Sequence, residues 1–158
     1  MSVKYIKASK KDAGVILDFI EKLAEYEKLS HEVLATEESL IKTLFADNPL
    51  AHVVFAEVEE KKAGFALYFF KYSTFLAQPT LHLEDLFVLP EFRGKSIGKG
   101  LILYLSKLAL EQNCGRMEWD VLDWNKPAIE FYDSLGAKPL KDWFTYRLSK
   151  EAMSKLSM

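Results

Sequence analysis

Two adjacent carboxylates and a glycine-rich turn stand out in segment 83–100, LEDLFVLPEFRGKSIGKG. Glu84 and Asp85 lie in an otherwise apolar stretch typical of a strand, which Pro90 ends. The glycines precede a long apolar-periodic stretch that predicts a helix. A strand, a glycine-rich turn and a helix N-terminus can bind a pyrophosphate, because backbone N–H groups and the helix dipole converge on the anion. The nearby acidic residues indicate that a reaction takes place beside a bound cofactor.

The turn does not fit either of two common nucleotide-binding motifs. Residues 94–96 (GKS) are similar to the end of a P-loop, but Leu89 stands where that motif has its first glycine. The dinucleotide motif G-x-G-x-x-G also fails, because residues 98–100 (GKG) are not followed by a third glycine. We therefore reject both interpretations.

Composition limits the class of protein. A chain of 158 residues fits one domain, 1–158, and a net charge of −2 gives no basic excess for nonspecific binding to nucleic acid or membrane. The single cysteine, Cys114, excludes an internal disulfide and a cysteine-based zinc cluster, and the three histidines have no metal-ligand spacing, so we expect no metal site. No apolar stretch approaches the roughly 20 residues of a membrane span, and the N-terminus lacks the apolar region of a signal peptide. We expect a cytoplasmic protein.

Hydrophobic periodicity predicts alternating strands and helices. Strands are expected over residues 3–8, 52–58, 63–72, 81–89, 117–122 and 144–148. Helices are expected from Ser9 to about 28, from Thr36 as N-cap to Phe45, over 97–113 and over 126–135. We expect a hairpin turn at 59–62, helix ends at Gly115 and Gly136, and a polar tail after 148.

The order of these elements indicates an α/β fold. The three consecutive middle strands imply antiparallel pairing, whereas the later strand–helix–strand unit implies a parallel pair with a right-handed crossover. We therefore expect a mixed central sheet with helices on both faces.

The segment after Pro90 resembles a known cofactor loop. Residues 93–98 (RGKSIG) resemble the R-x-x-G-x-G/A loop of the GNAT superfamily of N-acetyltransferases, and residues 123–125 (DWN) and 129–132 (IEFY) resemble its later segments. The element order agrees, and the resemblance covers nearly the whole chain. Residues 23–29 (LAEYEKL), 83–85 (LED) and 122–125 (LDWN) most resemble the diamine (spermidine/spermine and thialysine) N-acetyltransferases. The resemblance implies acetyl-CoA as co-substrate, direct attack in a ternary complex, and a homodimer with contacts from C-terminal strands.

The resemblance also indicates the cofactor residues. The pantetheine arm is expected to pair with the backbone of Leu86, Phe87 and Val88. The pyrophosphate is expected at Arg93, Gly94, Lys95, Ser96, Ile97, Gly98 and Lys99, and further contacts are expected from Asn125, Pro127 and Ala128. Ser96 departs from the family, which has glycine there: it either keeps the loop geometry and begins the helix, or its hydroxyl donates to a phosphate. Lys95 and Lys99 attract phosphate or are simply solvated. Asn125 contacts the cofactor or acts as the N-cap of the helix from Lys126, and both roles can coexist through side chain and backbone.

Acetyl transfer to an amine requires a base and an acid. An amine with a pKa near 10.4 is neutral in only about one molecule in 2,500 at pH 7. Glu84 is the candidate base, because partial burial in its strand would raise its pKa, and the resemblance implies action through water. Alternation puts Asp85 on the opposite face as a structural partner unless a bulge intervenes, and the resemblance implies such a bulge. Tyr132 matches the family's general acid, although a core aromatic beside Phe131 is the alternative.

The acceptor should be cationic if acidic side chains line its site. Tyr26 and Glu27 match substrate-contacting positions of the diamine enzymes, together with Glu84 and Asp85, although Glu27 could be a plain surface charge. Glu118 and Asp120 lie on one face by alternation and could add charge. The diamine enzymes are less acidic there, so a small primary amine, a lysine-like side chain or thialysine fits as well as spermidine. Acetylation of a protein or peptide and an inactive CoA-binding regulator are the alternatives. Phe144, Tyr146 and Leu148 could serve the core or a dimer interface.

Overall fold

The structure is a computed structural model that describes all residues, Met1–Met158. Its contacts divide the chain into two compact units, Met1–Asp120 and Val121–Met158. The first unit contains the whole sheet, and the second contains two helices. The expectation of a single domain over 1–158 stays a prediction. No helix combines the length and the apolar composition needed to cross a membrane.

The sheet of the first unit has five strands in the order β1-β2-β3-β4-β5. Strands β1 to β4 pair antiparallel, whereas β5 pairs parallel to β4, so the predicted mixed sheet is confirmed. The strands are β1 (Val3–Lys7), β2 (His52–Val58), β3 (Lys61–Ser73), β4 (Gln78–Val88) and β5 (Arg116–Trp119). The turn between β2 and β3 is shorter than predicted. Glu59 and Glu60 form it with φ of 49° and 65°, and positive φ at both positions is the signature of a two-residue type I′ hairpin.

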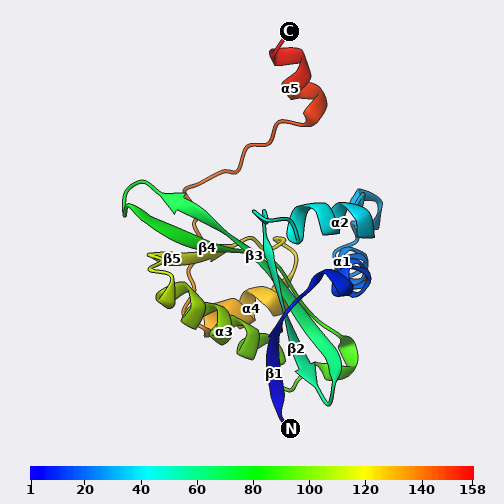
Figure 1. Cartoon of the computed structure of the whole chain (residues 1–158). Helices are drawn as coiled ribbons and strands as arrows, with labels where there is room; N and C mark the ends of the chain where they lie inside the picture. The colour runs from blue at the N-terminus through cyan, green and yellow to red at the C-terminus, as the bar shows by residue number, and fades with distance from the viewer. The chain divides into compact units, whose positions relative to one another are not determined.

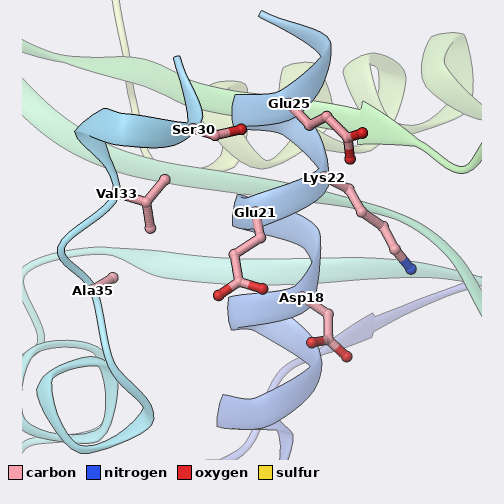
Figure 2. A pocket seen from close by; sticks show the side chains of 7 residues that line it. All are labelled: Asp18, Glu21, Lys22, Glu25, Ser30, Val33 and Ala35. Atoms are coloured by element: carbon pink, nitrogen blue, oxygen red, sulfur yellow. The ribbon is translucent and has the colours of Figure 1, made fainter. Parts of the chain in front are cut away.

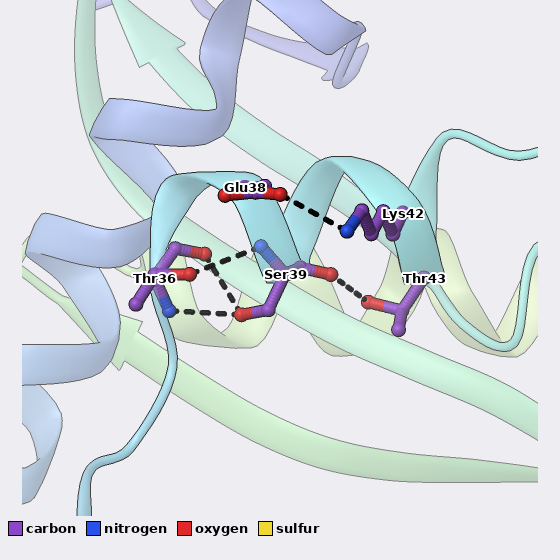
Figure 3. Close-up of polar contacts among 5 residues, drawn as sticks. All are labelled: Thr36, Glu38, Ser39, Lys42 and Thr43. Carbon is purple, nitrogen blue, oxygen red and sulfur yellow. Dashed lines mark hydrogen bonds and ion pairs between the residues drawn. The ribbon is translucent and has the colours of Figure 1, made fainter.

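The helices of the first unit are α1 (Ala13–Tyr26), α2 (Glu37–Leu44) and α3 (Ile97–Glu111), and those of the second are α4 (Lys126–Ser134) and α5 (Lys150–Leu156). Short 3₁₀ turns occur at Lys10–Asp12, Ser30–Glu32 and Pro90–Phe92. Figure 3 shows how α2 begins. The Thr36 hydroxyl accepts from Ser39 N at 3.1 Å, and Thr36 N donates to the Ser39 hydroxyl at 2.8 Å. This reciprocal pair satisfies N–H groups that the helix leaves free, so Thr36 is the predicted N-cap.

The predicted end of α3 at Gly115 is wrong. Asn113, not Gly115, ends α3: it has φ 59°, and Asn113 N and Cys114 N donate to the carbonyls of Leu110 and Ala109 at 3.1 and 2.9 Å. Asparagine tolerates this left-handed conformation, so no glycine is needed. The predicted polar tail contains α5, which Ser149 caps by accepting from Ala152 N.

The strand predicted over 144–148 is also wrong. The segment has no regular structure, and the side chains of Phe144 and Tyr146 are 88% and 94% exposed. Alternating apolar residues predict a strand only where a neighbouring strand supplies hydrogen bonds and a core covers one face. In this chain neither condition is met at 144–148.

Helices cover both faces of the sheet, as predicted (Figure 1). On one face, Phe19 of α1 packs against the rings of Phe55, Phe65 and Phe87, with centroids 5.0–6.4 Å apart. Tyr5 pairs with Ala56, which points away from Phe55, and Tyr5 stacks on Tyr104 of α3 at 5.5 Å. Helix α3 therefore lies on the face opposite to α1.

Candidate active site

The carboxylates of β4 lie at a β-bulge. Leu67 of β3 pairs with Asp85, whereas the next residue, Tyr68, pairs with Leu83, so Glu84 has no partner in the ladder. Such an extra residue resets the alternation of the strand. Asp85 lies beside Leu67, which packs in the α1 core. The Glu84 Oε2 atom lies 3.5 Å from Nε2 of His82, whose ring packs against that of Phe69 beside the same core. The structure therefore places both carboxylates on the α1 side, and the alternative that separates them is wrong.

The structure buries Asp85 more than Glu84, whereas the sequence predicts partial burial of Glu84. The side chain of Glu84 is 54% exposed, because the bulge turns it out of the strand. Asp85 is the partly buried group. Burial is the main cause that raises its pKa from 3.8 to about 7, and the charges of Glu84 and Glu27 add to the effect. A carboxyl with this pKa is partly protonated near neutral pH and sensitive to any cation that comes close.

The end of α1 brings two of the residues predicted to contact the acceptor close to the β-bulge. Helix α1 ends at Tyr26, and Lys28 adopts φ 62°, which lets Leu29 N donate back to the Ala24 carbonyl at 2.8 Å. The ring of Tyr26 meets Phe87 of β4 edge-on at 6.5 Å. Glu27 follows, partly buried, and burial raises its pKa. Because its negative charge contributes to the raised pKa of Asp85, Glu27 is not a plain surface charge.

Strands β4 and β5 separate beyond the bulge. Strand β5 pairs only with residues 80–83 of β4, whereas β4 continues to Val88. Leu86, Phe87 and Val88 pair with β3 on one side, and no strand pairs with their other edge. A free edge offers backbone N–H and C=O groups to an extended ligand. The backbone predicted to pair with the pantetheine arm therefore lies at such an edge.

The predicted pyrophosphate loop joins this edge to α3. Gly94 and Ser96 have φ of 75° and 60°, so Ser96 keeps the left-handed conformation that favours glycine. Ser96 is the N-cap of α3, and its side chain makes no capping hydrogen bond. Ile97 is buried and fixes the start of the helix, whereas Lys99 is exposed and Gly98 lies beside Val88.

The charged side chains of the loop have protein contacts of their own. Arg93 Nε donates to the Val88 carbonyl at 2.9 Å, and its guanidinium lies 5.1 Å from the ring of Phe87 and 5.5 Å from that of Tyr26. Arg93 therefore ties the loop to β4 and to the end of α1. Lys95 lies 5.6 Å from the Phe92 ring.

The predicted acidic wall along β5 is weaker than expected. Glu118 forms an ion pair with Lys71 of β3 at 3.5 Å, which partly offsets its charge. Asp120 lies beyond Trp119, the last residue of β5, and is exposed. The expected alternation of the two carboxylates therefore does not apply, since the strand ends between them.

The remaining predicted residues belong to the second unit. Asn125 Oδ1 accepts from Ala128 N at 3.4 Å, so the N-cap interpretation of Asn125 is confirmed, and Pro127 lies in the first turn of α4. Tyr132 lies on α4 with its ring 5.4 Å from that of Phe131. Gly136 ends this helix with φ 86°, as predicted. The catalytic role of Tyr132 stays a prediction.

An open hollow of about 450 Å³ lies elsewhere, on the outer side of α1 (Figure 2). None of its lining residues is a predicted site residue, and the chemistry described above does not use it; they are Asp18, Glu21, Lys22, Glu25, Ser30, Val33 and Ala35. No three His, Cys, Asp or Glu side chains are grouped so that they could hold a metal ion.

The site residues predicted from the sequence do not include His82. The feature that could have identified it is its spacing of two from Glu84, because residues two apart in a strand lie on the same face.

Comparison with known proteins agrees with this arrangement. The family described as Acetyltransferase (GNAT) family matches residues 17–137. Thialysine N-epsilon-acetyltransferase of Sus scrofa is 39% identical over 99% of this chain and 98% of its own length. L-ornithine N5-acetyltransferase of Arabidopsis thaliana is 29% identical over 94% of this chain and 85% of its own. The structure of an integron cassette protein from the mobile metagenome of V. cholerae superimposes with a TM-score of 0.82 at 28% identity, covering 99% of this chain and 98% of that one.

Proposed function

The chain belongs to the GNAT family of acetyltransferases, and from this premise we propose that it transfers an acetyl group to the primary amine of a small cationic acceptor. Members of the family take the acetyl group from acetyl-CoA. We propose direct attack of the amine within a ternary complex of the chain, acetyl-CoA and the acceptor. A lysine-like amine is our first candidate acceptor, and a polyamine is the second.

One observation carries the proposal: the carboxylates of Glu27, Glu84 and Asp85 gather beside the free edge of β4. Burial is the main cause of the raised pKa of Asp85, and the charges of Glu84 and Glu27 add to it; negative charges gathered in this way favour a cation. An extended cofactor arm that pairs with residues 86–88 would end close to these carboxylates. A cationic amine and a thioester would then meet at the bulge.

The residues of the chain can perform the proton transfers. When bound, acetyl-CoA supplies an electrophilic thioester carbonyl. Deprotonating the acceptor ammonium costs roughly 4–5 kcal/mol at neutral pH, so Glu84 would take that proton, directly or through water. Asp85 and Glu27 would hold the acceptor, and the Tyr132 phenol would give a proton to the departing thiolate. Arg93 would keep the loop against β4, as its bond to Val88 does here.

The relatives support the proposed lysine-like acceptor. Thialysine and ornithine, the substrates in the names of two relatives, are both amino acids with a primary amine on the side chain. The names of these two relatives therefore support a short lysine-like acceptor over a polyamine.

The test is release of free CoA from acetyl-CoA with thialysine, lysine, ornithine, spermidine and a lysine peptide as acceptors. We expect the highest kcat/KM with a lysine-like amine. Preference for the peptide would support the protein-acetylating alternative, and tight CoA binding without turnover of any amine would support an inactive regulator.

Tyr132→Phe should lower kcat by about 10²-fold or more while acetyl-CoA still binds, and an unchanged kcat would remove Tyr132 from the mechanism.

We also propose that a second copy of the chain covers the exposed aromatic side chains of segment 144–148. Its aromatic side chains are almost fully exposed, and such residues are more typical of an interface than of a free surface. Light scattering on the purified chain should give the mass of a dimer. Phe144→Ser together with Tyr146→Ser should then give a monomer, whereas a monomeric wild type would contradict the proposal.

A further inference from the structure

His82 lies next to the proposed base but has no role in the reaction described so far. Its ring is buried on β4, with 8% of the residue exposed, and lies tilted against the ring of Phe69, with centroids 4.9 Å apart. Its Nε2 atom lies 3.5 Å from Oε2 of Glu84. Packing fixes the ring, so the direction in which Nε2 points is also fixed.

The other ring nitrogen indicates which tautomer is favoured. The Nδ1 atom of His82 is buried and has no hydrogen-bond partner in the protein. A proton on Nδ1 would be a buried donor without an acceptor, whereas a proton on Nε2 faces a carboxylate. The neutral ring therefore keeps its proton on Nε2 and directs it at Glu84.

Glu118 is the other carboxylate near this histidine, because it is the register partner of His82 on β5. Its charge is engaged by Lys71 at 3.5 Å, which leaves Glu84 as the carboxylate in contact with Nε2. The separation of 3.5 Å is longer than the roughly 2.7–3.2 Å of a good N–H···O bond. The half-exposed Glu84 side chain has room to turn, and hydrogen bonds of catalytic groups often shorten when substrate binds.

We propose that His82 is a positioning residue: its Nε2–H holds the bulged Glu84 carboxylate in the direction from which it takes the proton of the acceptor amine. The histidine keeps its own proton, and the proton of the ammonium goes to Glu84. This inference rests on the proposed function of Glu84 as base. It adds the group that orients the base, which a flexible and exposed side chain needs if it is to act at one atom.

The kinetic test compares two variants of His82. His82→Phe keeps a flat ring on Phe69 but removes the donor, and we expect kcat to fall about tenfold while the KM for acetyl-CoA stays within about twofold. His82→Gln keeps an N–H donor close to the position of Nε2, and we expect most of kcat to return. His52→Phe is the matched control, because His52 on β2 also packs against aromatic rings, those of Tyr68 and Phe70, and should keep wild-type kcat.

Two further measurements separate failure of this inference from failure of the proposed base. If Glu84→Gln keeps full activity, Glu84 is not the base, and the proposed function fails at that point. If Glu84→Gln is inactive while His82→Phe has wild-type kcat, only the role of His82 is overturned. Nitrogen-15 NMR of the wild-type histidines tests the tautomer without activity and without a variant that must fold: we expect the proton on Nε2 of His82, and a proton on Nδ1 would overturn the inference.

Discussion

Glu27 at the end of α1 lies close enough to Asp85, after the bulge of β4, for its negative charge to raise the pKa of that carboxyl. Burial is the larger cause, and Glu84 adds to the effect, so the pKa of Asp85 is about 7. Burial also raises the pKa of Glu27 itself. Helix α1 and strand β4, which are far apart in the sequence, thus form one anionic site, and the free edge of β4 begins beside this site.

Removing the charge of Glu27 should weaken binding of the acceptor. Charge-assisted hydrogen bonds contribute about 1.5–3 kcal/mol, so Glu27→Gln should raise the KM for the amine by about ten- to a hundredfold and leave the KM for acetyl-CoA unchanged. Steady-state kinetics with each substrate varied in turn measures both. Glu25→Gln on the same helix is the control, because Glu25 is exposed and lines the outer hollow. Equal effects of the two substitutions would contradict a specific role for Glu27.

Asp85 should make the free protein less stable as the pH rises. Its pKa in the folded chain, about 7, lies above the ordinary 3.8, so the folded state binds more protons between these values and stability falls as pH rises through them. Asn resembles the protonated carboxyl. Asp85→Asn should therefore raise the free energy of unfolding at pH 8 by about 1–3 kcal/mol and change it little at pH 4.

Urea unfolding at several pH values measures this difference. Asp18→Asn, at an exposed position of α1, is the control and should show no such dependence on pH. A benefit of Asp85→Asn that is equal at pH 4 and pH 8 would mean that the carboxylate is not desolvated.

The sequence predicts the elements of the first unit well, because helix and strand periodicities there coincide with buried faces. The arrangement of the carboxylates around the proposed catalytic base is harder to predict. The bulge that brings Glu84 and Asp85 to one side depends on the register of β3 against β4, and no local residue pattern specifies that register. For the same reason the sequence predicts burial of Glu84, although Asp85 is the desolvated group. The engagement of Glu118 by Lys71 is likewise a contact between strands, which spacing alone does not predict.

Ser96 should show a backbone cost that glycine removes. A residue other than glycine in the left-handed region costs roughly 1–2 kcal/mol, and glycine loses about 0.5–1 kcal/mol more chain entropy on folding. Ser96→Gly should therefore stabilise the chain by up to about 1 kcal/mol. Ser96→Ala keeps the same φ, and the serine side chain makes no capping bond, so its stability should match wild type.

The same pair of variants tests the cofactor role of the hydroxyl. Calorimetry should give equal Kd values for acetyl-CoA with Ser96→Ala and wild type if Ser96 only shapes the loop. A Kd that rises about tenfold in Ser96→Ala but not in the control Ser106→Ala would show that the hydroxyl binds phosphate, since Ser106 lies well along α3 and donates to Ile102 O.

Gly100 should be required because Tyr5 leaves no space for a methyl group. A Cβ at position 100 would overlap the Tyr5 hydroxyl and lie 3.0 Å from Cζ of its ring. Alanine normally stabilises a helix by about 1 kcal/mol relative to glycine, but overpacking costs about 1–3 kcal/mol, so Gly100→Ala should destabilise the chain by about 1 kcal/mol. In a Tyr5→Phe background the hydroxyl is absent while a ring still stacks on Tyr104, and Gly100→Ala should there become neutral or stabilising. Thermal unfolding of the four chains gives this coupling as a double-mutant cycle.

Gly98→Ala is the control on the same helix. Its Cβ would meet only Val88, at 3.7 Å, so this substitution should stabilise the chain. An equal loss of stability at both glycines would mean that Tyr5 is not the cause.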